Sequence, residues 1–574
     1  MVRTKRKIVR KRMITMKKPL LSELTLREKI GQCLIPYPWY FYRECETDYR
    51  IQRTDEERKA LIQENQFGAY WEGLKVANQG VDLVPEAAGK LDYETNRQML
   101  AMHSSWTKIP ALMAADAEHE GAGTQFNGLT SICGPLALGA ANSEQDLFEL
   151  GKCVAKELRC AGINWRWAPP VDISNRFSLA VMRSISPDDP DKMIRLTNSY
   201  IKGMQSEGLA ATAKHFPGND RYEYRDGHFC NSILSSSEEE WWSEQGRIFQ
   251  EIFDGGVYSV MVGFTSFPAI DDTKINEEYI PSAFSKKIVT DLLKGKMNFK
   301  GVVVTDAVEM ASCVSTYSDY KKRMVELLKA GNDVILGCEL RTAALLEEAV
   351  LEGELPESRI DDACQRIIDM KEKMGLFEDN YFSPPYKGED VVKETQALNQ
   401  KIAEKSITLV RDKYGLIPVK QSDIKHVTIV CSSHSDGFSN ELECMKKEFE
   451  ARGATVTMQR RVGGKPDVKR FNETSDLIIY VAYVASHVPM GWPTLFGDEC
   501  RSYIYAFGEG REKSIGVSMG YPYIHYDIMG NAPAFINTYG KNPDSMKAFV
   551  KAVYGEIPLV GESPVKLIPD HMKW

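Results

Sequence analysis

Short runs of apolar residues alternate with amphipathic segments over the first two thirds of the chain. The segments between the runs have apolar positions at helical spacing, and the box Thr25-Leu-Arg-Glu28 predicts the start of the first helix. Continuous apolar strands with intervening helices predict a parallel sheet covered on both sides. About eight such units predict an α/β fold of the (β/α)8 TIM type, with a doubly wound sheet as the alternative. The expected strands are 33–36, 68–72, 111–115, 164–169, 211–216, 259–264, 301–305 and 334–337, and the clearest helices are 144–161, 190–207, 238–254 and 285–293.

A second alternating block follows a stretch rich in Asp, Asn, Pro and Gly. The stretch, 377–389, has the composition of an exposed linker. Apolar runs then recur at 407–410, 426–430, 477–482, 514–518 and 534–537. We therefore expect a basic, disordered tail over 1–20, a catalytic barrel over 21–376, a linker over 377–395 and a smaller α/β domain over 396–574.

Charge is distributed unevenly along the chain. The net charge is −8, but residues 1–18 carry nine Lys or Arg and no acid, so the rest of the chain is nine units more negative, at −17. Such a body would repel nucleic acid. No apolar core of a signal peptide follows the basic residues, no apolar run approaches the ~20 residues of a membrane span, and the twelve cysteines include no C-x-x-C pair. These patterns predict a cytoplasmic protein without nucleic-acid or membrane partners.

Polar residues follow several of the predicted strands at the point where each strand ends. In a barrel these positions all face one mouth, so residues distant in sequence converge there. A single acid after a strand, such as Asp172 or Asp306, is commonly a helix cap. Several together favour a functional site. The set comprises Asp116-Ala-Glu118-His119-Glu120, Asp172, Lys214-His215 and Asp306.

Asp306 from this set and a further pair, Asp226 and His228, have the chemistry of glycoside cleavage. Asp306 directly follows Val302-Val-Val-Thr305, four residues that we expect to be buried, and a rigidly held carboxylate can attack an electrophilic carbon. His228, with Asp226 two residues earlier to orient it, could donate and later accept a proton. A metal site built from His215, His228 and an acid is the rival hypothesis, but no tight ligand spacing supports it. Gly121-Ala-Gly123 lacks the third glycine of a dinucleotide loop, so we expect no metal and no cofactor.

The sequence resembles glycoside hydrolase family 3 from about Leu24 onward. The resemblance rests on six motifs, taken together in their order and at their separations along the chain. They are KIGQ at 29–32, IPALMAADAEHEG at 109–121, GINWRWAPPVDIS at 162–174, KHFPG at 214–218, D-x-H at 226–228 and FKGVVVTDAVEM at 299–310. The resemblance implies a (β/α)8 barrel, a C-terminal α/β sandwich domain and a two-step retaining mechanism. It also implies that the C-terminal domain could supply a loop to the site. The candidates are Trp492, Asp498 and Glu499, and the alternative is that these residues belong to an ordinary surface loop.

The resemblance also assigns roles, position by position. Asp306 matches the family's nucleophile, and the D-x-H of Asp226 and His228 resembles the acid/base dyad of the β-N-acetylglucosaminidase branch. Substrate-binding roles fall on Asp116, Arg183, Lys214 and His215.

The chain departs from that branch near the mouth. Asn219 replaces a second histidine, Gly227 replaces a usual Ser or Thr, and the run that begins at Glu118 lacks the family's arginines. These changes leave the aglycone open. We expect hydrolysis of terminal β-N-acetylglucosaminides. The alternatives are a β-glucosidase, a phosphorylase that uses inorganic phosphate with the same residues, and a non-catalytic sugar-binding protein.

Overall fold

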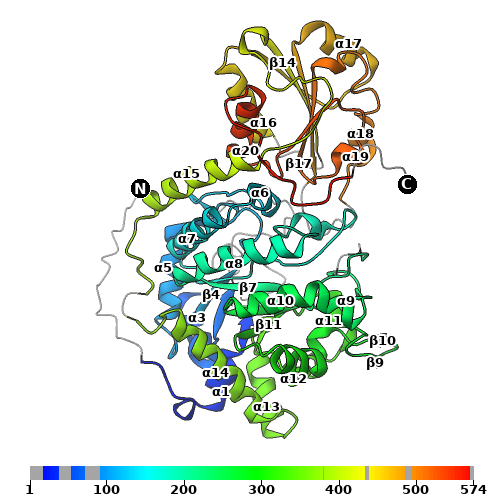
Figure 1. The fold of residues 1–574 in the computed structure, drawn as a ribbon. Helices are drawn as coiled ribbons and strands as arrows, with labels where there is room; N and C mark the ends of the chain where they lie inside the picture. The colour runs from blue at the N-terminus through cyan, green and yellow to red at the C-terminus, as the bar shows by residue number, and fades with distance from the viewer. Residues whose placement is uncertain are drawn as a thin grey trace.

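Eight parallel strands form the sheet of the first domain in the computed structural model, which describes residues 17–37, 53–71, 91–223, 225, 227–378, 381–433, 439–484 and 493–568 (Figure 1). From β2 to β12 each strand pairs with the next in chain order, and β12 pairs with β1. Just before β1 and β2, the Gly68 amide donates to the Gly31 carbonyl at 2.8 Å. This circular order confirms the barrel and excludes the doubly wound sheet, in which the strand order reverses. The strands are β1 (Leu34–Pro36), β2 (Ala69–Trp71), β4 (Leu112–Ala115), β6 (Trp165–Arg166), β7 (Ala210–Phe216), β8 (Ser259–Val262), β11 (Val302–Ala307) and β12 (Val334–Cys338).

Helices surround the barrel, and their ends follow local sequence signals. The predicted capping box forms: the Thr25 hydroxyl accepts from the Glu28 amide, and the Glu28 carboxylate accepts from the Thr25 amide. Pro190 opens α8, where its missing N–H costs no hydrogen bond. The helices are α1 (Leu26–Gln32), α3 (Asp55–Asn65), α5 (Tyr93–Ser104), α6 (Pro135–Ala141), α7 (Glu144–Cys160), α8 (Pro190–Ser206), α9 (Glu238–Ser243), α10 (Gln245–Asp254), η5 (Lys287–Lys296), α11 (Ala311–Thr316), α12 (Tyr320–Ala330), α13 (Thr342–Leu351) and α14 (Glu357–Lys373).

One predicted helix is divided in the structure. The segment expected as a single helix over 238–254 consists of α9 and α10, which meet at Glu244. Glu244 has φ −122° and ψ −88°, outside the helical region, so the chain changes direction there. Gly246 lies two residues after the break, and a Cβ at that position would come within 2.7 Å of the Trp241 ring. The apolar spacing nevertheless continues across the break, so the apolar pattern alone does not show it.

A six-stranded mixed sheet forms the C-terminal domain. Its order is β13-β18-β17-β16-β14-β15, with β13 antiparallel to β18 and every other pair parallel. The five strands expected from apolar runs are present. The sixth, β15, is an edge strand with largely exposed side chains, so it has no apolar run. The elements are β13 (Thr408–Asp412), β14 (His426–Ser433), α16 (Ser439–Glu450), β15 (Thr455–Arg460), α17 (Lys465–Thr474), β16 (Leu477–Val484), α18 (Gly497–Arg501), β17 (Ser514–Gly520), α19 (Ile524–Asp527), β18 (Ala534–Asn537) and α20 (Pro543–Val553).

The long helix α15 (Gly388–Ser406) lies between the two sheets (Figure 1). Its first residues occupy the second half of the expected linker. Asn399 Oδ1 accepts a hydrogen bond from the Cys133 amide at 2.7 Å, and Lys401 and Lys405 both bind the nearly buried carboxylate of Asp146 on α7. The helix is therefore fastened to the barrel. We propose the domain limits 21–376 and 396–574 with a linker over 377–395, and α15 runs from this linker into the second domain.

Among the described residues, no helix is long and apolar enough to cross a membrane. In the same part of the chain, no group of His, Cys, Asp and Glu is arranged to hold a metal ion.

Candidate active site

The predicted sugar-binding residues gather at the carboxyl ends of neighbouring barrel strands. Asp116 directly follows β4, while Lys214 and His215 lie near the end of β7. Lys214 Nζ is 3.3 Å from Asp116 Oδ1. The Lys214 side chain is 3% exposed, whereas that of Asp116 is 40% exposed. Asp116 therefore has the accessible carboxylate of this pair, and Lys214 lies behind it.

A buried carboxylate, Glu118, joins Lys214 to Arg183. Its Oε2 is 2.7 Å from Lys214 Nζ, and Arg183 donates to it through Nε at 2.7 Å and through Nη2 at 2.9 Å. Glu118 is 7% exposed, so its charge is removed from water and needs these partners. Because one carboxylate binds both cations, it fixes the positions of the two cationic side chains. The structure thus brings Asp116, Arg183 and Lys214 together through a residue to which the sequence analysis gave no role.

Opposing effects of burial and charge set the pKa values in this cluster. Burial favours the neutral carboxyl of Glu118, but Arg183 and Lys214 outweigh it and hold the Glu118 pKa well below its usual range. Burial likewise favours the neutral amine of Lys214, but Glu118 and Asp116 raise the Lys214 pKa. Glu118, Arg183 and Lys214 are therefore charged at neutral pH. Lys214 and Arg183 are available only as hydrogen-bond donors.

Asp172 orients His215. The carboxylate of Asp172, 2% exposed, lies with Oδ2 2.9 Å from His215 Nδ1, and its Oδ1 accepts from the His215 amide at 3.2 Å. Because Asp172 binds Nδ1, this contact leaves Nε2 of the imidazole available and fixes the direction in which Nε2 points. The simpler reading of Asp172 as a helix cap is wrong, because the next α-helix, α8, begins only at Pro190.

Asp306 is the second-last residue of strand β11, at the same end of the barrel as Asp116 and Lys214. Its Oδ1 accepts from the Ala307 amide at 2.8 Å, and the side chain is half-buried. The preceding Thr305 is fully buried and its hydroxyl accepts from the Leu336 amide on β12 at 3.1 Å. The backbone on both sides of Asp306 is thus held by neighbouring strands. A carboxylate fixed in this way has the rigidity that nucleophilic attack requires.

The proposed acid/base pair is only partly described. Asp226 lies outside the described residues, so its contact with His228 remains a prediction. His228 is exposed, and its carbonyl accepts from the Ala311 amide at 3.1 Å, where α11 begins. This bond ties the loop after β7 to the loop that follows Asp306. The histidine and the aspartate are therefore on connected segments of one mouth.

The two acids suggested from the C-terminal domain bind within that domain. Glu499 accepts from the Ser433 amide at 3.3 Å and pairs with Arg460 at 3.2 Å, while Asp498 pairs with Arg461 at 3.3 Å. Trp492 lies outside the described residues. These contacts favour a structural role for Asp498 and Glu499.

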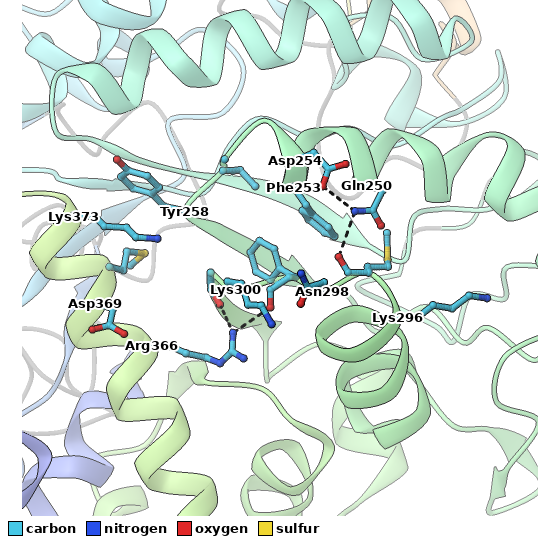
Figure 2. Close-up of a pocket in the computed structure, with 16 residues that line it drawn as sticks. Gln250, Phe253, Asp254, Tyr258, Lys296, Asn298, Lys300, Arg366, Asp369 and Lys373 are labelled. Atoms are coloured by element: carbon cyan, nitrogen blue, oxygen red, sulfur yellow. Dashed lines mark hydrogen bonds between the residues drawn. The ribbon is translucent and has the colours of Figure 1, made fainter.

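A depression of about 430 Å³ lies at the opposite end of the barrel (Figure 2). Tyr258 and Gly301, which directly precede β8 and β11, line it, together with Lys300, Lys373 and Arg366. Arg366 donates from Nη1 to the Phe299 and Gly301 carbonyls, each at 3.2 Å, so its guanidinium fastens the loop before β11. None of the predicted site residues lines this depression. The candidate active site is therefore at the other end of the strands.

Comparisons with known proteins give the family and the shared fold. The chain matches the family model described as "Glycosyl hydrolase family 3 N terminal domain" over residues 25–370. A β-N-acetylglucosaminidase/β-glucosidase from Cellulomonas fimi is 26% identical over 487 residues, which are 80% of this chain and 84% of that protein. Among solved structures, a β-glucoside phosphorylase has a TM-score of 0.80 at 24% identity, with 95% of this chain and 94% of that chain covered. A family 3 β-N-acetylglucosaminidase from Paenibacillus sp. str. FPU-7 has a TM-score of 0.77 at 24% identity, with 95% and 99% covered. The two structural likenesses establish a shared fold across both domains.

Proposed function

The chain belongs to glycosyl hydrolase family 3 and is a glycoside hydrolase, and from that premise we propose that it is a retaining exo-β-N-acetylglucosaminidase. Asp306 is the proposed nucleophile, and His228, oriented by Asp226, is the proposed acid and base. Asp116, Arg183, Lys214 and His215 bind the sugar in this proposal. The observation that supports it most is the anchored carboxylate of Asp306 at the same barrel end as the Lys214–Asp116 pair.

The proposed reaction has two steps. In the first, an oxygen of the Asp306 carboxylate attacks the anomeric carbon while His228 gives its proton to the glycosidic oxygen, and the aglycone leaves as an alcohol. In the second, neutral His228 takes a proton from water as the water oxygen attacks the same carbon. The bond to Asp306 then breaks, and its carboxylate is regenerated. Two displacements on one carbon return the original β configuration.

The binding residues suit a terminal sugar with free hydroxyls. Lys214 and Arg183 are permanent donors, and the more exposed carboxylate of Asp116 is an acceptor. Such charged groups form hydrogen bonds with hydroxyls that are stronger than neutral ones. The name of the Cellulomonas fimi relative includes both the N-acetylglucosaminide and the glucoside activity. The D-x-H of 226–228 is the sequence feature on which we choose the N-acetylated sugar.

The test compares 4-nitrophenyl N-acetyl-β-glucosaminide with 4-nitrophenyl β-glucoside under identical conditions. We expect kcat/KM for the N-acetylated sugar to be greater by about tenfold or more, because a site that hydrogen-bonds a substituent discriminates against its absence. Good turnover of the glucoside without turnover of the N-acetylated sugar would contradict the substrate assignment. A covalent adduct on Asp306 from a 2-deoxy-2-fluoro sugar would exclude a non-catalytic sugar-binding protein.

Phosphorolysis is the second candidate, and the residue proposed as acid/base favours it. An imidazole is neutral or cationic, so it repels an incoming phosphate less than a carboxylate would. The same glycoside panel with millimolar phosphate separates the two reactions. A faster reaction with sugar 1-phosphate as product would identify a phosphorylase, and indifference to phosphate would identify a hydrolase.

A further inference from the structure

The loop after β6 is fastened to the C-terminal domain at Arg176. Arg176 Nη1 donates to Asp527 Oδ1 at 2.9 Å, and Asp527 ends helix α19. The Tyr521 hydroxyl lies 2.8 Å from the Arg176 carbonyl and 2.9 Å from Asp527 Oδ2. The Arg176 and Asp527 side chains are 18% and 16% exposed, so solvent weakens this ion pair less than it would a surface pair. Both the side chain and the backbone of Arg176 are thus held by the second domain.

The same loop contacts the segment that leads to the proposed acid/base. Asn175 Nδ2 donates to the carbonyl of Arg221, and Asn175 Oδ1 accepts from the Phe177 amide at 2.8 Å. Asp172, at the start of this loop, holds His215. One short stretch of chain therefore lies between the C-terminal domain, the sugar-binding histidine and the segment before His228.

Barrel residues anchor the other side of that segment. Asp220 Oδ2 accepts from both the amide and the hydroxyl of Ser235 at 2.6 Å, and Arg221 Nη2 pairs with Glu244 at 3.1 Å. Ala311 holds the His228 carbonyl. The loop after β6 adds an anchor at Arg221 that depends on contacts with Asp527 and Tyr521.

We propose that Asp527 and Arg176 are positioning residues through which the C-terminal domain sets the segment that carries His228. The ion pair holds the loop after β6, and Asn175 connects this loop to the Arg221 carbonyl, seven residues before His228. The proposal rests on the proposed function only in assigning proton transfer to His228. Small displacements of a catalytic group reduce rate strongly, by up to about 100-fold for roughly 1 Å.

The chain offers a matched control for this ion pair. Asp146 on the barrel helix α7 pairs at 2.7 Å with Lys401 and also binds Lys405, both on the connecting helix α15. Its side chain is 4% exposed, so it is at least as shielded as Asp527. Its partners, however, do not touch the loop after β6 or the segment at Arg221. Asp146→Asn therefore removes a comparable interaction without the proposed connection.

The kinetic experiment compares Asp527→Asn with Asp146→Asn on two N-acetyl-β-glucosaminides. One has a 2,4-dinitrophenyl leaving group, which departs without protonation, and the other has a methyl leaving group, which needs the acid. We expect Asp527→Asn to lower kcat/KM about tenfold or more for the methyl glycoside and less than about twofold for the dinitrophenyl glycoside, since only proton transfer is misplaced. Asp146→Asn should change neither value. Equal losses on both substrates, or no loss on either, would overturn the proposal.

A second measurement does not depend on which sugar is cleaved. Hydrogen–deuterium exchange of peptides covering 219–231 should be faster in Asp527→Asn than in Asp146→Asn, while β8 and β11 remain unchanged. If Asp527→Asn folds poorly, Tyr521→Phe replaces it in this experiment, because it keeps the ring and loses only the hydroxyl. Tyr521→Phe should also increase exchange in the same peptides. Unchanged exchange over 219–231 in both variants would overturn the proposal. Increased exchange without turnover of any N-acetylglucosaminide would instead contradict the proposed function and leave the coupling supported.

Discussion

The ammonium of Lys214 lies 2.7 Å from a carboxylate oxygen of Glu118, and both side chains are almost fully shielded from water. Glu118 also receives two hydrogen bonds from Arg183, so one buried acid orients two cations that the family resemblance assigns to sugar binding. A buried charge of this kind is costly to leave unpaired. The positions of Arg183 and Lys214 therefore depend on Glu118, which is itself nearly buried.

Replacing Glu118 tests this dependence. Glu118→Gln should lower the free energy of unfolding by about 3 kcal/mol, because Arg183 loses this paired carboxylate and the buried Lys214 keeps only the Asp116 carboxylate. It should also raise KM, since Arg183 and Lys214 are no longer fixed. Glu238→Gln is the control, because its pair with Lys296 is about half exposed and worth under about 1 kcal/mol. Denaturant unfolding and steady-state kinetics measure both effects, and equal stability of the two variants would contradict the role given to Glu118.

The same carboxylate gives a pH dependence of stability. The Glu118 pKa is lower in the folded protein than in the unfolded chain, where it is about 4.3. Its contribution is therefore present above that value and lost as pH falls through the folded pKa. The difference in unfolding free energy between the wild type and Glu118→Gln should shrink below about pH 4. A difference that stays constant from pH 7 to pH 3 would contradict the depressed pKa.

Removing the proposed nucleophile should abolish the covalent step. Asp306→Ala should lower kcat/KM by roughly three orders of magnitude or more, because the attacking group is lost. The half-buried side chain contributes little packing, so the unfolding midpoint should change little. Azide can enter the space left by the carboxylate, and we expect it to restore activity with an α-glycosyl azide as product. A β-glycosyl azide, or unchanged activity without azide, would show that another residue is the nucleophile.

Removing the proposed acid/base should have an effect that depends on the leaving group. His228→Ala should lower kcat/KM for a methyl glycoside by about 100-fold or more and leave that for a dinitrophenyl glycoside nearly unchanged. The aryl leaving group departs without a proton, which is the reason for the difference. This dependence is measured by plotting log kcat/KM against the pKa of the leaving group, and the slope should be steeper for His228→Ala than for the wild type. The same slope as in the wild type would assign the proton to another residue.

Lys371 on α14 makes a separate prediction about stability. It is fully buried, its Nζ donates to Gln32 Oε1 at 2.6 Å, and burial lowers its pKa to about 7. Between pH 7 and about 10 the unfolded chain binds more protons at this lysine than the folded protein does, so stability should rise with pH over this range. Lys371→Met should remove that rise, measured as unfolding free energy against pH. Lys373→Met, at an exposed position of the same helix, should retain it.

The barrel strands were predictable because each is a short apolar run buried on both faces. Chain order then gave the topology, since consecutive βα units join in only a few ways. The edge strand β15 was missed because its side chains are exposed. The break at Glu244 was missed because the apolar spacing continues across it, although Gly246 lies two residues later. Both features depend on tertiary surroundings and not on local pattern.

The site residues likewise include some that the sequence predicts and one, Glu118, that only the folded structure reveals. Asp116, Lys214, His215 and Asp306 were found because each is close to the end of an apolar run. Glu118 was not assigned a role, because its importance depends on Arg183, which is distant in sequence and comes close only when the barrel folds. The signal that could have found it is a second acid two residues after Asp116, in the same short segment after the strand.

The ion-pair cluster around Lys214 also has a consequence for how substrate arrives. Asp116 and Glu118 contribute two negative charges, and Lys214 and Arg183 contribute two positive ones, so the cluster is electrically balanced. An uncharged glycoside approaching it feels short-range hydrogen bonds and little long-range field. Association should therefore be almost insensitive to ionic strength, in contrast with enzymes that draw charged substrates into a cleft of opposite sign. Any sugar carrying a carboxylate or phosphate would meet no compensating excess of positive charge in this cluster.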